Sequence, residues 1–203
     1  MSKRDTSLDP KIIESAKKEF LDKGYLESSL DTICFNAGVT TGAIYRRYEG
    51  KEGLFFEVVK PAINVFEKLK KETIDENEKR KADNRMKDSY DSYANTIKRW
   101  IELLYSEKES MKILMSKSEG TEYYNYLHDF TEENVNISYN FMKKLEEKSM
   151  CKINVSYKEF HVLLTSYWSA IFELIIHDFT KEQALTFSEK IVDFFSWENV
   201  IEF

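Results

Sequence analysis

Residues 37–48 bring hydroxyl, phenol and guanidinium groups together at helical spacing. On a helix that turns about 100° per residue, Ile44 and Tyr48 lie together on the side towards the core, and the opposite side holds Gly42, Tyr45 and Arg46. The outward side therefore offers hydrogen-bond donors and no carboxylate, which suits contact with phosphates and the edges of bases. This pattern predicts the turn and second helix of a helix-turn-helix.

Two earlier helices are predicted to hold this segment in place. Asp9-Pro10 begins the first, because Asp caps free N–H groups and Pro needs no donor there, and Gly24 ends it. Residues 28–31 offer a capping box for a short second helix, which Gly38 ends before Thr40 caps the third. A compact three-helix unit results. The alternative is an arbitrary bundle of three amphipathic helices, for which so short a second helix and a basic outer face would be unusual.

An ordered series of residues runs through this region: Ile12-Ile13, Ala16, Phe20, Gly24-Tyr25, Ser28-Ser29-Leu30, Ile33, Ala37–Tyr45, Tyr48 and Lys51-Glu52-Gly53-Leu54-Phe55. On these residues the segment Lys11–Pro61 closely resembles the N-terminal DNA-binding domain of the TetR family of bacterial one-component repressors. Family members commonly carry Tyr-His or Tyr-Tyr-His where this chain has Arg46-Arg47. We therefore expect its operator preference to lie in that pair.

The resemblance implies DNA-binding roles for the matching positions. The residues expected to contact phosphates are Ser28, Thr40, Tyr45 and Lys51. The residues expected to face the groove and read bases are Thr41, Gly42 and Arg46, with Arg47 on the phosphate-side flank. For Arg46 the chemistry agrees, because a guanidinium can fork onto guanine O6 and N7 with about 1–3 kcal/mol of discrimination.

Composition and charge fit a soluble bacterial regulator. The chain of 203 residues has a net charge of −6, but residues 1–60 hold 10 basic and 10 acidic residues, so the excess acid lies beyond them. The basic surface is therefore local. Only Cys34 and Cys151 are present, and neither a signal peptide nor a membrane-spanning run is evident, so we expect a cytoplasmic protein.

The remainder of the chain is predicted to be helical. A connecting helix over residues 51–74 contains Pro61, which we interpret as a kink rather than a helix boundary. Further helices are predicted over 89–105, 107–117 and 119–148, then one that contains residues 160–175 with a possible cap at Ser156, and a last one opened by a capping box at residues 180–183. The fold class is all-α, with about nine helices. We expect a DNA-binding helix-turn-helix domain over 1–50 and a ligand-binding and dimerisation domain over 51–203.

The last two helices are apolar on more than one face, and such surface is usually buried against a partner. In the family this pair forms a four-helix bundle across a two-fold axis. We therefore expect a homodimer on a near-palindromic operator. The expected interface residues are Phe160, Tyr167, Ile171, Phe187, Ile191, Phe194 and Phe195.

An aromatic pocket for an unknown small-molecule effector is the expected second site. Its candidate residues are Trp100, Tyr105, Met111, Tyr123, Tyr126, Phe130, Phe141, His161 and Trp168, and each of them can equally be core. Glu173 could receive a cationic ligand or face solvent. The three histidines lack metal-ligand spacing, so we expect neither metal nor cofactor.

These features together predict a homodimeric transcriptional repressor that a small-molecule ligand releases from its operator. Release would be a shift between two spacings of the N-terminal units, transmitted by the helix at residues 51–74. No catalytic motif is present, so an enzyme is not expected. The alternative is a helical interaction protein of the same fold that does not read DNA sequence.

Overall fold

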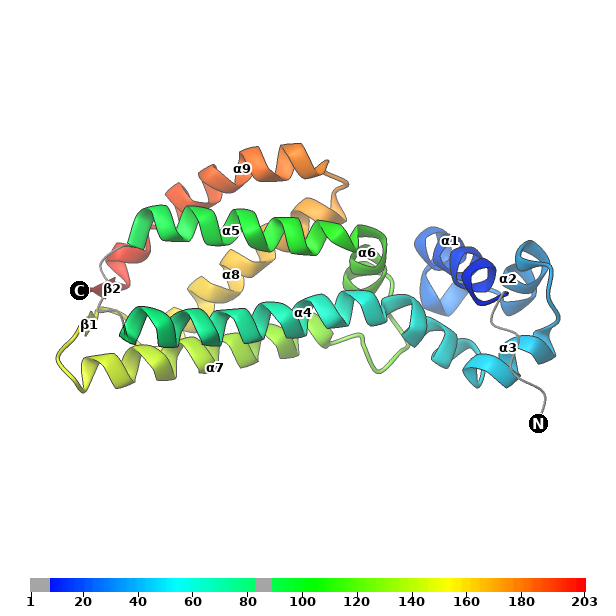
Figure 1. Ribbon diagram of the computed structural model, residues 1–203, viewed down its shortest axis with the longest axis horizontal. Coiled ribbons are helices and arrows are strands. Elements are labelled where there is room, and N and C mark those ends of the chain that lie inside the picture. The colour runs from blue at the N-terminus through cyan, green and yellow to red at the C-terminus, as the bar shows by residue number, and fades with distance from the viewer. Residues whose placement is uncertain (1–7, 83–88) are drawn as a thin grey trace. The chain divides into compact units, whose positions relative to one another are not determined.

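Helices make up almost all of the computed structural model, which describes residues 8–82 and 89–203. This confirms the all-α fold class. In chain order (Figure 1), the helices of the described residues are α1 (Asp9–Glu27), α2 (Leu30–Ala37), α3 (Thr41–Tyr48), α4 (Lys51–Ala82), α5 (Ser89–Ser106), α6 (Lys108–Ser116), α7 (Tyr126–Glu146), α8 (Tyr157–Ile176) and α9 (Lys181–Phe194).

The chain divides into two compact units, which are described separately. Unit 1 comprises residues 1–64 and 107–126, and unit 2 comprises residues 65–106 and 127–203. Unit 1 thus contains the first part of α4 and all of α6, in addition to the three N-terminal helices. The sequence placed a domain boundary after residue 50 and did not predict that α6 belongs with them.

The beginning of α1 differs from its prediction. Leu8 is the N-cap residue and makes no side-chain capping bond, so Asp9 is the first helical residue and not the cap. The Asp9 carboxylate instead pairs with Arg47 of α3. Gly24 interrupts α1 as predicted, since its backbone angles are not helical (φ 73°, ψ 174°), and a further short helical segment continues after this kink to Glu27.

The helix-turn-helix proper consists of α2 and α3. Ser29 is the N-cap of α2, where its side chain accepts from the N–H of Thr32, and Gly38 ends the helix at φ 67°. In α3, Ala43, Ile44 and Tyr48 are buried, as the helical spacing predicted for Ile44 and Tyr48. The helix ends at Glu49, which adopts a left-handed conformation with φ 62°.

The segment after α6 packs against the end of α1. The N–H of Tyr25 donates to the carbonyl of Lys117 at 2.9 Å. The ring of Tyr123 lies 6.0 Å from that of Phe56 in a stacked arrangement. The sequence predicted a helix from residue 119, but α7 begins only at Tyr126 because residues 118–125 form turns against unit 1.

Unit 2 has an aromatic core. Phe66 of α4, Phe130 of α7 and Trp168 and Phe172 of α8 pack together, with the Phe66 and Phe130 centroids 4.6 Å apart. Helices α5 and α9 lie side by side (Figure 1). The hydroxyl of Tyr105 contacts the carbonyls of Leu174 and Phe179 at 3.3 and 3.1 Å, tying the end of α5 to the turn after α8.

The C-terminal end of the chain closes unit 2. A short 3-10 helix, η1 (Trp197–Asn199), leads into β2 (Ile201–Glu202), which pairs antiparallel with β1 (Lys152–Ile153). The sequence indicated only a polar break near β1 and did not predict this pairing. Helix α9 begins with the predicted capping box, in which Thr180 and Gln183 bond reciprocally, and α8 has the same device at Ser156 and Glu159.

Two features of the long helices depart from the sequence predictions. Pro61 lies inside α4 and does not end it, as predicted, but the helix continues to Ala82 rather than ending near residue 74. Helix α8 has the length and mean hydropathy (1.2) of a membrane span, although no such run was expected. Its apolar residues include Phe160, Trp168 and Phe172, which are buried in unit 2, as in the core helix of a globular protein.

Candidate functional site

The exposed face of α3 is the surface on which the predicted DNA contacts gather. Gly42, Tyr45 and Arg46 are exposed, and the side chain of Tyr45 is 56% accessible. Thr40 is exposed just before the helix, and Thr41 is half-buried in its first turn. Helix α3 contains no acidic residue. Its outer surface therefore presents the guanidinium of Arg46 and the phenol of Tyr45, and at Gly42 no side chain covers the backbone.

The two neighbouring arginines occupy different environments. The Arg46 side chain is exposed, whereas Arg47 is half-buried and its Nε lies 2.9 Å from Oδ1 of Asp9. The side chains of Arg47 and Asp9 are 12% and 25% accessible. Arg46 is therefore the arginine presented outward, while Arg47 connects α3 to the start of α1.

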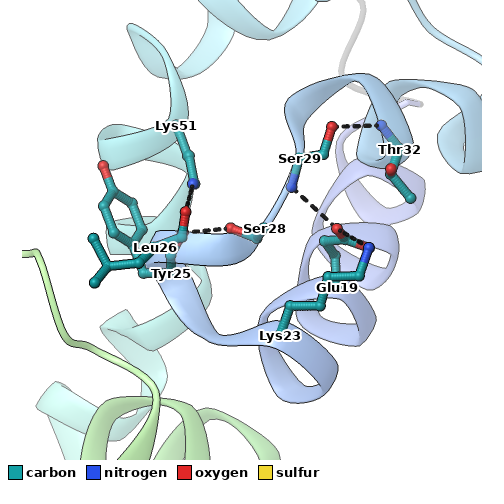
Figure 2. Close-up of polar contacts among 8 residues, drawn as sticks. All are labelled: Glu19, Lys23, Tyr25, Leu26, Ser28, Ser29, Thr32 and Lys51. Carbon is teal, nitrogen blue, oxygen red and sulfur yellow. Dashed lines mark hydrogen bonds and ion pairs between the residues drawn. The ribbon is translucent and has the colours of Figure 1, made fainter.

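Ser28 and Lys51 lie where they stabilise the turn between α1 and α2 (Figure 2). The buried Ser28 hydroxyl donates to the carbonyl of Tyr25 at 2.7 Å. The Lys51 ammonium donates to the carbonyl of Leu26 at 3.2 Å and lies 4.6 Å from the centroid of the Tyr25 ring. Burial lowers the pKa of Lys51, against the opposing effect of Glu27 and Glu19. Both residues thus already bind protein groups at the end of α1.

Glu19 is a part of this arrangement that the sequence did not reveal. Its carboxylate is only 7% accessible and accepts from the N–H of Ser29 and from the ammonium of Lys23, each at 3.0 Å (Figure 2). The N–H of Ser29 is thereby satisfied at the start of α2. The Glu19–Lys23 spacing is visible in the sequence, but an (i, i+4) pair is usually a surface feature.

Unit 2 contains a cavity of about 160 Å³ with a largely aromatic and aliphatic wall. The residues that line it are Thr73, Glu76, Thr96, Trp100, Ser138, Phe141, Met142, Leu145, Phe160, Leu164, Tyr167, Trp197, Val200, Ile201 and Phe203. Of the predicted ligand residues, Trp100 and Phe141 line this cavity. The polar positions and the residues of the C-terminal segment were not predicted, because no local pattern links them.

The other predicted ligand residues lie elsewhere. Met111, Tyr123 and Tyr126 belong to unit 1. Phe130 and Trp168 are core residues, 6% and 2% accessible. Tyr105 bonds two backbone carbonyls, and His161 contacts Glu132 across α8 and α7. Glu173 is exposed beside His177. Within residues 8–82 and 89–203, no three or more His, Cys, Asp or Glu side chains are grouped to hold a metal.

The residues predicted for a dimer interface divide into two groups. Phe160, Tyr167, Ile171 and Ile191 are at most 5% accessible within the chain, so they have little surface to offer a partner. Phe187 and Phe194 are 39% and 83% accessible, and Phe195 is half-buried. Spacing alone could not separate the groups, because it does not show which apolar residues of α8 and α9 the rest of the chain covers.

Comparison with known proteins places the N-terminal helices in a family. Residues 12–58 match the family model described as bacterial regulatory proteins, tetR family. The match covers most of α1, all of α2 and α3, and the beginning of α4. A search of curated proteins finds no match.

Solved structures share the fold over almost the whole chain. NalD of Pseudomonas aeruginosa, described as the secondary repressor of the MexAB-OprM multidrug efflux pump, is 19% identical, with 96% of each chain covered and a TM-score of 0.60. A TetR-like transcriptional regulator from Rhodococcus sp. RHA1 is 12% identical, with 97% of each chain covered and a TM-score of 0.61. FadR of Bacillus subtilis, solved with stearoyl-CoA, is 16% identical, with 92% of this chain and 97% of that chain covered and a TM-score of 0.55.

Identities this low show a common fold, which confirms the expected combination of an N-terminal helix-turn-helix with a helical C-terminal part. The family match lies on the same helices that present Tyr45 and Arg46. Residues 12–58 therefore form a DNA-binding domain of the tetR family of bacterial regulatory proteins, as in a DNA-binding transcriptional regulator.

Proposed function

We propose that the protein is a homodimeric repressor that binds a near-palindromic operator through α3 and leaves it when a small molecule occupies the cavity of unit 2. The observation that most directly supports DNA contact is the exposed face of α3. It presents Tyr45 and Arg46 without an acidic residue in the helix, and Gly42 permits close approach of its backbone. Thr40 and Tyr45 supply hydroxyl groups for phosphates, and Thr41, Gly42 and Arg46 lie at base edges.

The roles of the remaining contact residues follow from their surroundings. Arg47 positions α3 through Asp9 and flanks the phosphates. Ser28 supports the turn before α2. Lys51 donates one proton to Leu26, and an ammonium group has three, so donors remain for a phosphate.

Binding to duplexes from the DNA that flanks the gene tests this assignment. Arg46→Ala should weaken specific binding by about 5- to 150-fold, the factor for one bidentate contact with guanine. Arg46→Lys keeps the charge but loses the planar fork, so it should recover non-specific binding and not specific binding. Lys18→Ala, which removes an exposed positive charge from α1, is the matched control. If Arg46→Ala and Lys18→Ala bind the operator equally, α3 does not read it.

Dimerisation is proposed from an exposed row of mostly small residues on α8 and from an exposed aromatic face of α9. Val162 begins a row on α8 that continues through Ser166, Ser169 and Glu173, all exposed and at the spacing of one helix face. Small residues in such a row permit close helix packing. Phe187 and Phe194 are separated by two turns of α9 and lie on one exposed face. Together these two faces are suited to pair with their copies in a four-helix arrangement.

Sedimentation analysis tests the dimer with a closely matched control. Phe194→Ser should shift the protein towards monomer, because it removes an aromatic side chain that is 83% accessible. Phe35→Ser removes one that is 86% accessible on α2 and should leave the dimer unchanged. Equal behaviour of the two variants would contradict an interface at α9. In a dimer, two copies of α3 would read half-sites about one duplex turn or slightly more apart.

The cavity of unit 2 is the proposed effector site. Its volume of about 160 Å³ is close to that of an engineered protein cavity that holds benzene. The wall includes Trp100, Phe141 and Trp197, together with Glu76, whose carboxylate already pairs with Arg99 at 3.0 Å. We therefore favour a small aromatic compound with a hydrogen-bond donor. The stearoyl-CoA found in FadR of Bacillus subtilis is much larger.

Helix α4 supplies a physical route from effector to operator. Thr73 and Glu76 line the cavity and belong to α4, which begins at Lys51 directly after α3. A ligand that contacts them preferentially in one position of α4 would shift the population between operator-binding and released states. The shift can be no larger than the difference in the ligand's affinity for the two states.

A panel of small aromatic amines, with stearoyl-CoA for comparison, tests both steps. A ligand should raise the melting temperature and weaken operator binding, and Ser138→Leu, which fills part of the cavity, should abolish both effects. Ligand binding that survives Ser138→Leu would place the site elsewhere. Binding that leaves operator affinity unchanged would contradict release by the effector.

A further inference from the structure

The hydroxyl of Thr41 is already engaged by neighbouring side chains of α2. Its Oγ1 donates to Oδ1 of Asp31 at 3.4 Å and accepts a weak bond from Sγ of Cys34 at 3.8 Å. A threonine hydroxyl has one proton, so the Thr41 group that donates to Asp31 has no further proton for a base acceptor. The donor expected at this position is therefore used within the protein.

The carboxylate of Asp31 is the exposed hydrogen-bonding group next to Thr41. It lies in the first turn of α2, is exposed, and contacts the first residue of α3. A carboxylate has two oxygens with about four acceptor positions, of which the bond from Thr41 uses one. The surface beside Thr41 is thus an acceptor, although α3 taken alone has no carboxylate on its outer face.

We propose that Asp31 is a specificity-determining residue that accepts a hydrogen bond from the N4 amino group of cytosine in the operator. In the major groove, guanine presents only acceptors and thymine presents an acceptor and a methyl group, so both would be unfavourable beside a carboxylate. Adenine has an N6 donor next to the N7 acceptor, whereas cytosine presents its N4 donor alone. Cytosine is therefore the best match.

The inference depends on the proposed DNA contact of α3 and adds a second helix to the reading surface. Arg46 and Asp31 would then read opposite chemistries, since a guanidinium only donates and a carboxylate only accepts. Asp31 also brings a negative charge close to phosphates, which lowers affinity for every sequence. Its contribution should therefore appear as discrimination between sequences rather than as overall affinity.

Selection of binding sites from randomised duplexes tests the role of Asp31. The wild-type chain should enrich a motif with cytosine at one position in each half-site. Asp31→Asn should lose that cytosine and favour adenine there, because an amide can both donate to N7 and accept from N6. Asp22→Asn makes the same charge change at an exposed position of α1 and should retain the wild-type motif. Asp31→Ala, a second variant, should show no base preference at the same position.

Direct binding measurements then give the size of the effect. Replacing the selected cytosine should weaken wild-type binding by about 5- to 150-fold, the usual cost of one mismatched base pair, and Asp31→Asn binding by less than about threefold. An Asp31→Asn motif identical to that of the wild type would overturn this inference alone and leave the proposed reading by α3 intact. A wild-type chain that enriches no motif would overturn both.

Discussion

Replacing Glu49 with glycine should stabilise the protein, because Glu49 ends α3 in a conformation that favours glycine. Its φ is 62°, and its N–H donates to the carbonyl of Tyr45 at 3.0 Å, so the helix end depends on this conformation. A side chain in the left-handed region costs roughly 1–2 kcal/mol. Glycine removes that cost but adds about 0.4–1 kcal/mol of chain entropy to the unfolded state. Taking the midpoints of these two ranges, the expected net gain is about 0.8 kcal/mol.

Thermal unfolding at fixed protein concentration measures this gain. For a chain of this size, 1 kcal/mol corresponds to about 2–4 °C, so the melting temperature should rise by about 1–4 °C. Glu49→Ala is the matched control, since it removes the same carboxylate but keeps a Cβ at positive φ. Its stability should stay within about 0.5 kcal/mol of the wild type.

The two variants separate backbone strain from charge. If Glu49→Gly and Glu49→Ala stabilise equally, the carboxylate and not the backbone is responsible. If Glu49→Gly melts at or below the wild-type temperature, the left-handed conformation at the end of α3 costs less than the structure indicates.

The remaining predictions concern contacts that connect distant segments. Arg47→Ala and Asp9→Ala should each lower the free energy of unfolding by about 1 kcal/mol. The double variant should lose little more than either single variant, as a double-mutant cycle measured by denaturant unfolding would show. Fully additive losses would mean that the Arg47–Asp9 pair contributes nothing. Tyr105→Phe should cost about 1 kcal/mol in denaturant unfolding because the bonds to the Leu174 and Phe179 carbonyls are lost. Burial, and to a smaller extent the charge of Asp178, raises the pKa of Tyr105 from 10.0 to about 12. The stabilisation by the hydroxyl should therefore be complete below pH 10 and lost as the pH rises towards 12. The wild type should lose its stability advantage over Tyr105→Phe in that range. Gly120→Ala should destabilise unit 1, because the φ of Gly120 is 85° and a Cβ there would lie 2.2 Å from Cδ2 of Leu26. Adding Leu26→Ala should restore part of the lost stability. If it restores none, the whole cost lies in the backbone conformation of residue 120.

The correct predictions came from residues whose environment depends on local geometry. The helical period placed Ile44 and Tyr48 inside and Arg46 outside, because one apolar stripe on a short helix can face only the core. The capping box of Thr180 and Gln183 formed as expected because both partners belong to a single turn. Such features need no knowledge of the rest of the chain.

Errors arose where a residue's partner is distant in sequence. Asp9 was assigned to cap α1, but an arginine 38 positions later takes its carboxylate. Phe160 and Tyr167 stay predicted interface residues, and within the chain they line the cavity together with Trp197 and Phe203 of the C-terminal segment. Apolar spacing shows that a residue is covered and not what covers it.

The sequence by itself determined that this protein is almost entirely helical and that residues 40–48 form the cap and second helix of a helix-turn-helix, because helical period, glycine turns and capping residues act over a few positions. Tertiary structure decided which groups on that helix remain available for DNA. In the folded chain Arg47 pairs with Asp9 and the Thr41 hydroxyl donates to Asp31, so Arg46 stays exposed and a carboxylate lies beside Thr41. The physical reason is that a side chain has few donors, and their use depends on neighbours that only folding brings within reach.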